Sequence, residues 1–147
     1  MTKPLQDIGI LLAVAAIYAV ACVSPTVYFD NGGTVCTGMR FGTPIGWMAL
    51  LFGWIPPFTV AWAANPVFLV ALVLFGVRKY TAASVAAGVA VALAATTPLL
   101  LFVGARGLEV GYVLWQSSFI VLLLGSLWSR RRDNSTTQDA VDMDALE

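Results

Sequence analysis

Two cysteines carry the most distinctive chemistry in this sequence. Cys22 ends an apolar stretch, and Cys36 follows in a segment that also holds Gly32, Gly33 and Gly38. A single pair of cysteines on the oxidising side of a membrane is typical of a structural disulfide. We therefore predict a disulfide between Cys22 and Cys36 that ties this glycine-rich loop back to the end of the first helix.

Cys22 also allows a second interpretation. Residues 19–22, Ala-Val-Ala-Cys, loosely match a lipoprotein cleavage box after an apolar stretch. Cleavage there would leave a lipid-anchored Cys22 and three membrane spans. Against this, the usual leucine of the box is missing, Asp7 precedes the apolar stretch, and lipidation would leave Cys36 without a partner. The disulfide is the favoured interpretation, and lipidation is the alternative.

Strongly polar side chains are rare within the apolar stretches. Asn65 and Gln116 lie at comparable depths in two of them. We predict a hydrogen bond between these two side chains, of a kind that contributes about 0.6–2 kcal/mol in membrane proteins. A substrate-binding site at the same residues is the less favoured alternative. At the edge of the last apolar stretch, Arg106 and Glu109 predict an ion pair across a short hairpin.

A third group of candidate binding residues combines one arginine with aromatic side chains. Arg40, Trp47 and Trp54 lie between the first two apolar stretches. Arginine and tryptophan dominate the hot spots of binding surfaces. Tryptophan also anchors helices at the level of lipid headgroups. Both interpretations of these residues stay open.

Enzymatic chemistry finds little support in the sequence. The chain has no histidine, which removes the commonest general base and the commonest metal ligand. No acid, base and nucleophile converge in any apolar stretch. We therefore expect no catalytic site, no metal and no cofactor.

The composition indicates which elements must position these residues. Hydrophobic residues make up 59% of the 147 residues and charged residues 11%, against about 45–50% and about 25% in soluble domains. The net charge of zero argues against a nucleic-acid partner. The predicted fold class is an all-α integral membrane protein, whose first partner is the lipid bilayer.

Four apolar stretches can cross a bilayer, which needs about 20 helical residues. The predicted spans are 8–27, 58–77, 82–103 and 108–128, within a membrane domain that covers residues 1–132. Residues 42–77 could instead hold two spans, but the positive-inside rule favours one. With one span, six bases share one side of the membrane: Lys3, Arg78, Lys79, Arg130, Arg131 and Arg132. We therefore predict a bacterial inner-membrane protein with both termini in the cytoplasm.

Two further segments flank the spans. Residues 44–55 begin with Thr43-Pro44 and stop at Pro56-Pro57, and as a helix they would reach only about 18 Å. They predict an outer interfacial helix or a re-entrant segment. Residues 133–147 contain five acids and no base, which predicts a disordered cytoplasmic tail. A helix that docks on a partner is the alternative for this tail.

Small residues recur along the third span. Ala82, Ala86, Ala90 and Ala94 are spaced by four positions, one helical turn apart. Small faces let helix backbones approach closely. Packing within the bundle is the favoured use of this face, and self-association into a homo-oligomer is the alternative.

Three classes of function fit these observations. The first is a non-enzymatic accessory or binding protein, such as a regulator of a larger membrane complex or an immunity factor against a membrane-active toxin. The second is an oligomeric subunit of a small channel or carrier, which would need a polar path. The third is a membrane enzyme on lipid or quinone, for which no residue cluster is present. We rank them in that order and expect the external surface to carry the binding function.

Overall fold

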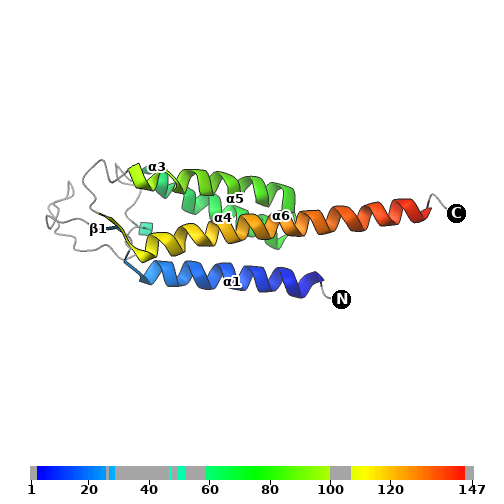
Figure 1. Ribbon diagram of the computed structural model, residues 1–147, viewed down its shortest axis with the longest axis horizontal. Coiled ribbons are helices and arrows are strands. Elements are labelled where there is room, and N and C mark those ends of the chain that lie inside the picture. Colours follow the sequence, from blue (N-terminus) through cyan, green and yellow to red (C-terminus); the bar gives the residue numbers. More distant parts are fainter. Residues whose placement is uncertain are drawn as a thin grey trace.

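The computed structural model is a bundle of helices that run along one common axis (Figure 1). It describes residues 3–25, 27–28, 47, 50–51, 59–99 and 107–144. In chain order the elements are α1 (Lys3–Val23), β1 (Val27–Tyr28), α3 (Thr59–Trp62), α4 (Ala64–Gly76), α5 (Tyr80–Ala94), β2 (Gly107–Leu108) and α6 (Val110–Asp144). The two chain termini lie at one end of the bundle, the terminal end, and the strands lie at the other, the strand end.

Several helices have the length and composition of membrane spans. Leu5–Val23, Tyr80–Leu99 and Val110–Ser135 are long and apolar enough to cross a bilayer, and Val60–Gly76 is a shorter apolar segment. Apart from the two-residue strand pair, the described elements are helical. The fold class of a helical membrane protein is therefore supported, whereas the count of four spans stays a prediction.

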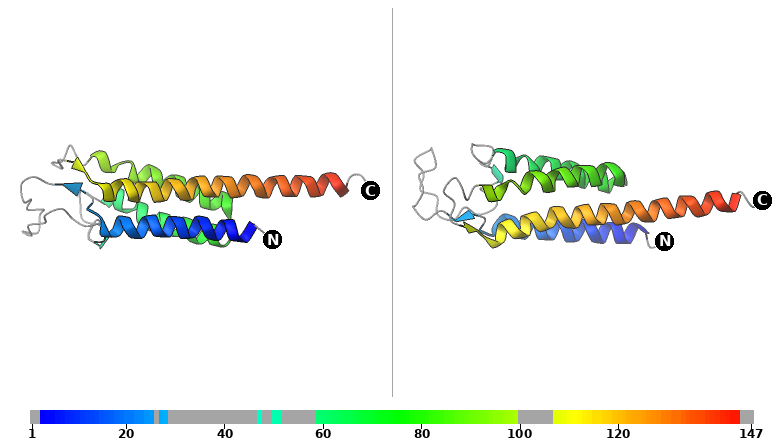
Figure 2. Two further views of the ribbon diagram at one scale, coloured as in Figure 1. Left: turned by 60° about the horizontal axis from the view of Figure 1, so that its bottom comes forward. Right: turned by 45° about the horizontal axis from the view of Figure 1, so that its top comes forward.

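The bundle is organised around α6. This helix packs against α1 on one side and α5 on the other, and α4 packs mainly against α5 (Figure 2). The buried core combines Val14 of α1, Phe68 and Phe75 of α4, and Phe119 and Leu122 of α6. The large, fully buried side chains thus come from α1, α4 and α6, and α5 contributes mainly small ones.

Helix α5 fits because its buried face is made of alanines. Ala83, Ala87, Ala90 and Ala94 are fully buried, whereas Ala82 is exposed. The small face predicted for the third span therefore packs largely inside the bundle, rotated slightly from the predicted stripe. Because these alanines are small, α5 approaches α4 and α6 closely, and the phenylalanines of α4 and α6 pack in the same core as the alanines.

Two prolines decide where the helices break. Pro66 has no N–H to bond to the carbonyl of Trp62, and the chain turns at Ala63 between α3 and α4. Pro98 likewise cannot bond to the carbonyl of Ala94, where α5 ends. The Thr97 hydroxyl donates to that Ala94 carbonyl instead, at 2.8 Å. The third span, predicted at 82–103, therefore starts at Tyr80 and leaves α-helical geometry at Ala94.

The turn between α4 and α5 has an unusual residue at its centre. Arg78 adopts a φ of 61°, a left-handed conformation that favours glycine. Its N–H donates to the Phe75 carbonyl and the N–H of Lys79 donates to the Leu74 carbonyl, both at 2.9 Å. This pattern is a Schellman motif, and it closes the α4–α5 hairpin at the terminal end.

Helix α6 extends beyond the bundle (Figure 1). We predicted a disordered tail from residue 133, but the helix continues to Asp144. No proline or glycine follows Gly125 within it. Each residue added to an existing helix gains a hydrogen bond without a new nucleation cost, which is the physical reason for the difference.

At the strand end, α1 and α6 are tied by their backbones. Val27 pairs with Leu108 and Tyr28 with Gly107 in an antiparallel register. The N–H of Gly111 donates to the Pro25 carbonyl at 2.8 Å, and a Cβ at Gly111 would lie only 2.4 Å from that oxygen. Of the predicted interfacial helix at 44–55, Trp47, Leu50 and Leu51 are helical, and the rest lies outside the described residues.

Candidate functional site at the terminal end of the bundle

A buried carboxylate joins three helices at the terminal end. Asp7 of α1 is only 8% exposed. One of its oxygens accepts a hydrogen bond from the Tyr80 hydroxyl of α5 at 2.8 Å. The other accepts from the Ser129 hydroxyl and the Arg132 guanidinium of α6, each at 3.0 Å. We call these four residues the Asp7 cluster.

Local sequence explains how α1 and α6 bring these groups together. Ser126, Ser129 and Arg132 are spaced by three residues, so they lie on one face of α6, and both serines are fully buried. A Cβ at Gly125 would lie 2.7 Å from Cγ2 of Ile10. Glycine and serine on this face therefore let α1 approach closely enough for Asp7 to reach Arg132.

The two opposite charges of the Asp7 cluster, on Asp7 and Arg132, are paired with each other. The Arg132 side chain is 22% exposed and pairs with Asp7, and it also donates to the Gln6 amide oxygen. A buried carboxylate with one cation and two hydroxyl donors has its desolvation cost offset by charge-assisted hydrogen bonds. This arrangement holds α1, α5 and α6 in register.

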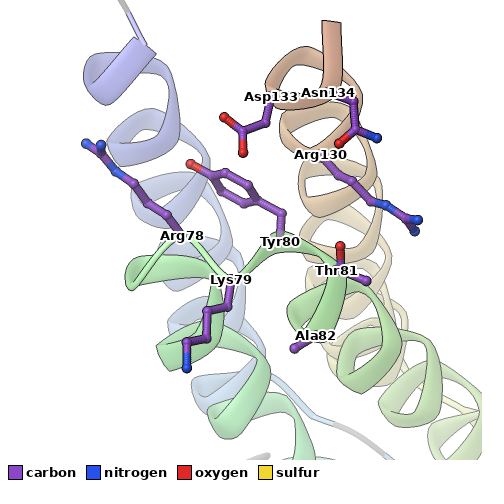
Figure 3. A pocket seen from close by; sticks show the side chains of 8 residues that line it. All are labelled: Arg78, Lys79, Tyr80, Thr81, Ala82, Arg130, Asp133 and Asn134. Atoms are coloured by element: carbon purple, nitrogen blue, oxygen red, sulfur yellow. The ribbon is translucent and has the colours of Figure 1, made fainter. Parts of the chain in front are cut away.

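A basic pocket opens beside the Asp7 cluster and shares Tyr80 with it. The pocket has a volume of about 270 Å³ and lies between the α4–α5 turn and α6 (Figure 3). Its lining residues are Arg78, Lys79, Tyr80, Thr81, Ala82, Arg130, Asp133 and Asn134. In Figure 3 the Tyr80 ring points toward α1, where its hydroxyl bonds to Asp7, and the side chains of Arg78, Lys79 and Arg130 point outward in three different directions. The rim is positively charged and solvent-exposed.

A second polar cluster lies nearer the strand end. The Oδ1 atom of Asn65 accepts hydrogen bonds from the Tyr18 hydroxyl at 3.0 Å and from Nε1 of Trp115 at 2.8 Å. The Phe68 ring stacks on Tyr18 at 5.1 Å and packs against Phe119 at 4.4 Å. We call Tyr18, Asn65 and Trp115 the Asn65 cluster. It joins α1, α4 and α6 through a neutral amide.

The predicted contact between Asn65 and Gln116 is wrong. Gln116 donates instead to the Val91 carbonyl of α5, at 3.5 Å, and its Oε1 is buried without a partner among the described residues. Successive residues of a helix point about 100° apart. Because Trp115 faces Asn65, the next residue, Gln116, faces α5.

The remaining predicted site residues are only partly described. Cys22 is a free, half-buried thiol, and the bridge to Cys36 stays a prediction because Cys36 lies outside the described residues. Arg40, Trp54 and Arg106 also lie outside them, so the ion pair to Glu109 is not tested. Trp47 is 43% exposed. Within the described part of the chain, no three acid or cysteine side chains gather as metal ligands.

Sequence reasoning missed the Asp7 cluster, although two signals pointed to it. Asp7 and Arg132 fall on the same side of the membrane in the predicted topology, and each adjoins an apolar span. The serine spacing before Arg132 indicates which face of α6 meets a neighbouring helix.

In comparisons with family models, with curated proteins and with solved structures, nothing matches this chain. Its chemistry therefore has to be inferred from its own residues.

Proposed function

We propose that this chain is a four-span protein of a bacterial inner membrane, with both termini in the cytoplasm, that acts as a non-enzymatic binding protein. Its binding site is the basic pocket at the cytoplasmic, terminal end. The sequence favours the external surface instead, but Arg40 and Trp54, two of the candidate residues there, lie outside the described residues. The observation that carries this proposal is the contrast between the pocket and the membrane interior. The pocket cations Arg78, Lys79 and Arg130 make no ion pair within the described residues, whereas most intramembrane polar groups are already bonded.

Hydroxyls inside the spans illustrate that contrast. The side chains of Ser84, Thr96, Ser117, Ser118 and Ser126 each donate to a carbonyl three or four residues earlier in their own helix. Such groups do not line a continuous polar path. A binding protein is therefore better supported than a channel or carrier subunit.

The charge distribution supports the proposed topology. Arg78 and Lys79 share one pocket with Arg130, and Arg132 is bonded to Asp7 near the start of α1. With Arg131, which lies between Arg130 and Arg132 on α6, five bases gather at the end of the bundle that holds both chain termini. Cytoplasmic loops of inner-membrane proteins carry this excess of lysine and arginine.

Complementation with two sets of substitutions tests the proposal. In a strain lacking the chromosomal copy, the first set changes Arg78, Lys79 and Arg130 to glutamine, and the second changes Asn65 to leucine and Gln116 to methionine. We expect the first set to abolish complementation of the deletion phenotype and the second to retain it, with both proteins present in the membrane at wild-type amounts.

Liposomes that contain the purified protein provide the second arm. We expect no flux of ions or small solutes above that of empty liposomes. Flux that disappears with the Asn65 and Gln116 substitutions would contradict the binding function and favour a channel or carrier.

A further inference from the structure

The basic pocket has the charge of a phosphate-binding site. Three bases and one acid line it, Arg78, Lys79, Arg130 and Asp133, which leaves an excess of two positive charges. All three bases are exposed, and their long side chains can turn inward from the rim toward a bound anion. An excess of two charges over about 270 Å³ suits one phosphodiester group.

The backbone conformation of Arg78 indicates that its positive charge serves to bind a ligand. The left-handed φ of 61° at Arg78 is a conformation in which glycine is the favoured residue. An arginine there is disfavoured by its Cβ, and its side chain makes no hydrogen bond or ion pair within the described residues. Strained non-glycine residues of this kind cluster at ligand-binding positions.

The first turn of α5 adds hydrogen-bond donors to the same pocket. Helix α5 starts at Tyr80, and Lys79 before it makes no side-chain capping bond. Thr81 and Ala82 of this turn line the pocket. Free backbone N–H groups at a helix N-terminus favour an anion, so they complement the three cations.

Apolar surface next to the pocket distinguishes a lipid from a soluble anion. Trp128 of α6 is 68% exposed at the same end of the bundle, although two positions along a helix place it on a different face from Arg130. Val73 of α4 is 65% exposed, and Val77, in the turn directly before Arg78, is 59% exposed. Acyl chains would cover these side chains while a headgroup occupies the pocket, and exposed tryptophan is typical of this depth in the bilayer.

We propose that the basic pocket binds the phosphate headgroup of an anionic glycerophospholipid from the membrane leaflet at the terminal end. This inference deepens the proposed function and rests on it for the membrane placement. Asp133 limits the excess charge, and the amide oxygen of Asn134, which also lines the pocket, can accept from the hydroxyls of a glycerol headgroup. Choline headgroups carry a compensating positive charge and no hydroxyl, so they should bind less well.

Native mass spectrometry of the full chain in detergent measures this binding directly. Phosphatidylglycerol and phosphatidylcholine are added at equal concentrations, and the lipid-bound fractions give the two affinities. We expect phosphatidylglycerol to bind more tightly to the wild-type protein. Each pocket cation removed should weaken its binding about fivefold, and two together about 25-fold.

Arg78→Gly and Arg130→Gln are the informative substitutions. Glycine suits the backbone at position 78, so Arg78→Gly should fold at least as well as the wild type and still lose affinity. Arg131→Gln is the matched control for Arg130→Gln, because Arg131 is exposed on the same helix but does not line the pocket. It should retain wild-type affinity.

Three outcomes would overturn the lipid proposal. They are equal binding of the two lipids, equal loss of affinity in the Arg131→Gln control, and displacement of the lipid by inorganic phosphate at the same concentration. The last outcome would indicate a site for a soluble anion. Because the protein in this experiment is in detergent, these results do not depend on its orientation in the cell. A wrong topology would instead appear in reporter fusions.

Discussion

The Asp7 cluster and the Asn65 cluster each join three helices, but with different chemistry. Around Asp7 a carboxylate receives hydrogen bonds from one guanidinium and two hydroxyls, at the end of the bundle. Around Asn65 a neutral amide oxygen receives hydrogen bonds from a phenol and an indole, among stacked rings. Helix α1 contributes one residue to each cluster, whereas α6 contributes two to the Asp7 cluster and one to the Asn65 cluster.

Their positions explain the difference. The Arg132 side chain is 22% exposed, so water near the end of the bundle lowers the cost of keeping an ion pair there. Asn65 is 6% exposed and lies beside the fully buried Phe68 and Phe119. An uncharged acceptor costs less than an ion at that depth. Together the clusters fix α1 against the other helices at two levels.

The largest effect is expected at Asp7. Asp7→Ala should lower the free energy of unfolding by about 3 kcal/mol, because Arg132 and two hydroxyls lose their shared acceptor. Helix content followed during titration with a denaturing detergent measures this loss. Adding Arg132→Leu to Asp7→Ala should cost less than the sum of the two single changes.

Arg131→Leu serves as the matched control for Arg132→Leu, since Arg131 is exposed. It should change the free energy of unfolding by less than about 0.5 kcal/mol. Additive effects of Asp7→Ala and Arg132→Leu would show that the two residues do not act as one pair, and the comparison of the two clusters would then fail.

A smaller effect is expected at Asn65. Asn65→Leu should cost about 1–2 kcal/mol, because the Tyr18 hydroxyl and the Trp115 indole both lose their acceptor. Gln116→Met should be neutral or stabilising, because Oε1 of Gln116 is already buried without a partner among the described residues. The same denaturation experiment, with the double variant, measures the coupling between the two positions.

That coupling should stay within about 0.5 kcal/mol, as for residues without a shared contact. A coupling above about 1 kcal/mol would instead support the interhelical hydrogen bond that the sequence predicts between Asn65 and Gln116.

Much of the fold could be predicted from the sequence, because span length and charge asymmetry are properties of the chain itself. The apolar stretches and the grouping of Arg78 with Arg130 follow from them. Hydrogen-bond partners could not be predicted, because they depend on helix rotation: one residue decides whether Trp115 or Gln116 faces Asn65.

Two other differences between the predicted spans and the observed helices have local causes. The break at Ala63 and the end of α5 at Ala94 follow from Pro66 and Pro98, whose missing N–H groups interrupt the helices within apolar stretches. Hydropathy alone does not register such breaks. The Asp7 cluster was missed because a charge just before a span resembles a solvated flank until the neighbouring helix is placed.

The orientation of the terminal end is the central claim, and reporter fusions test it most directly. A reporter that is active only in the cytoplasm, fused after Lys79 or after Arg132, should be active at both positions. A reporter that is active only outside, fused at Gly32, should be active as well. An external position for Lys79 with a cytoplasmic position for Arg132 would contradict the account, because it would separate the residues that form the basic pocket.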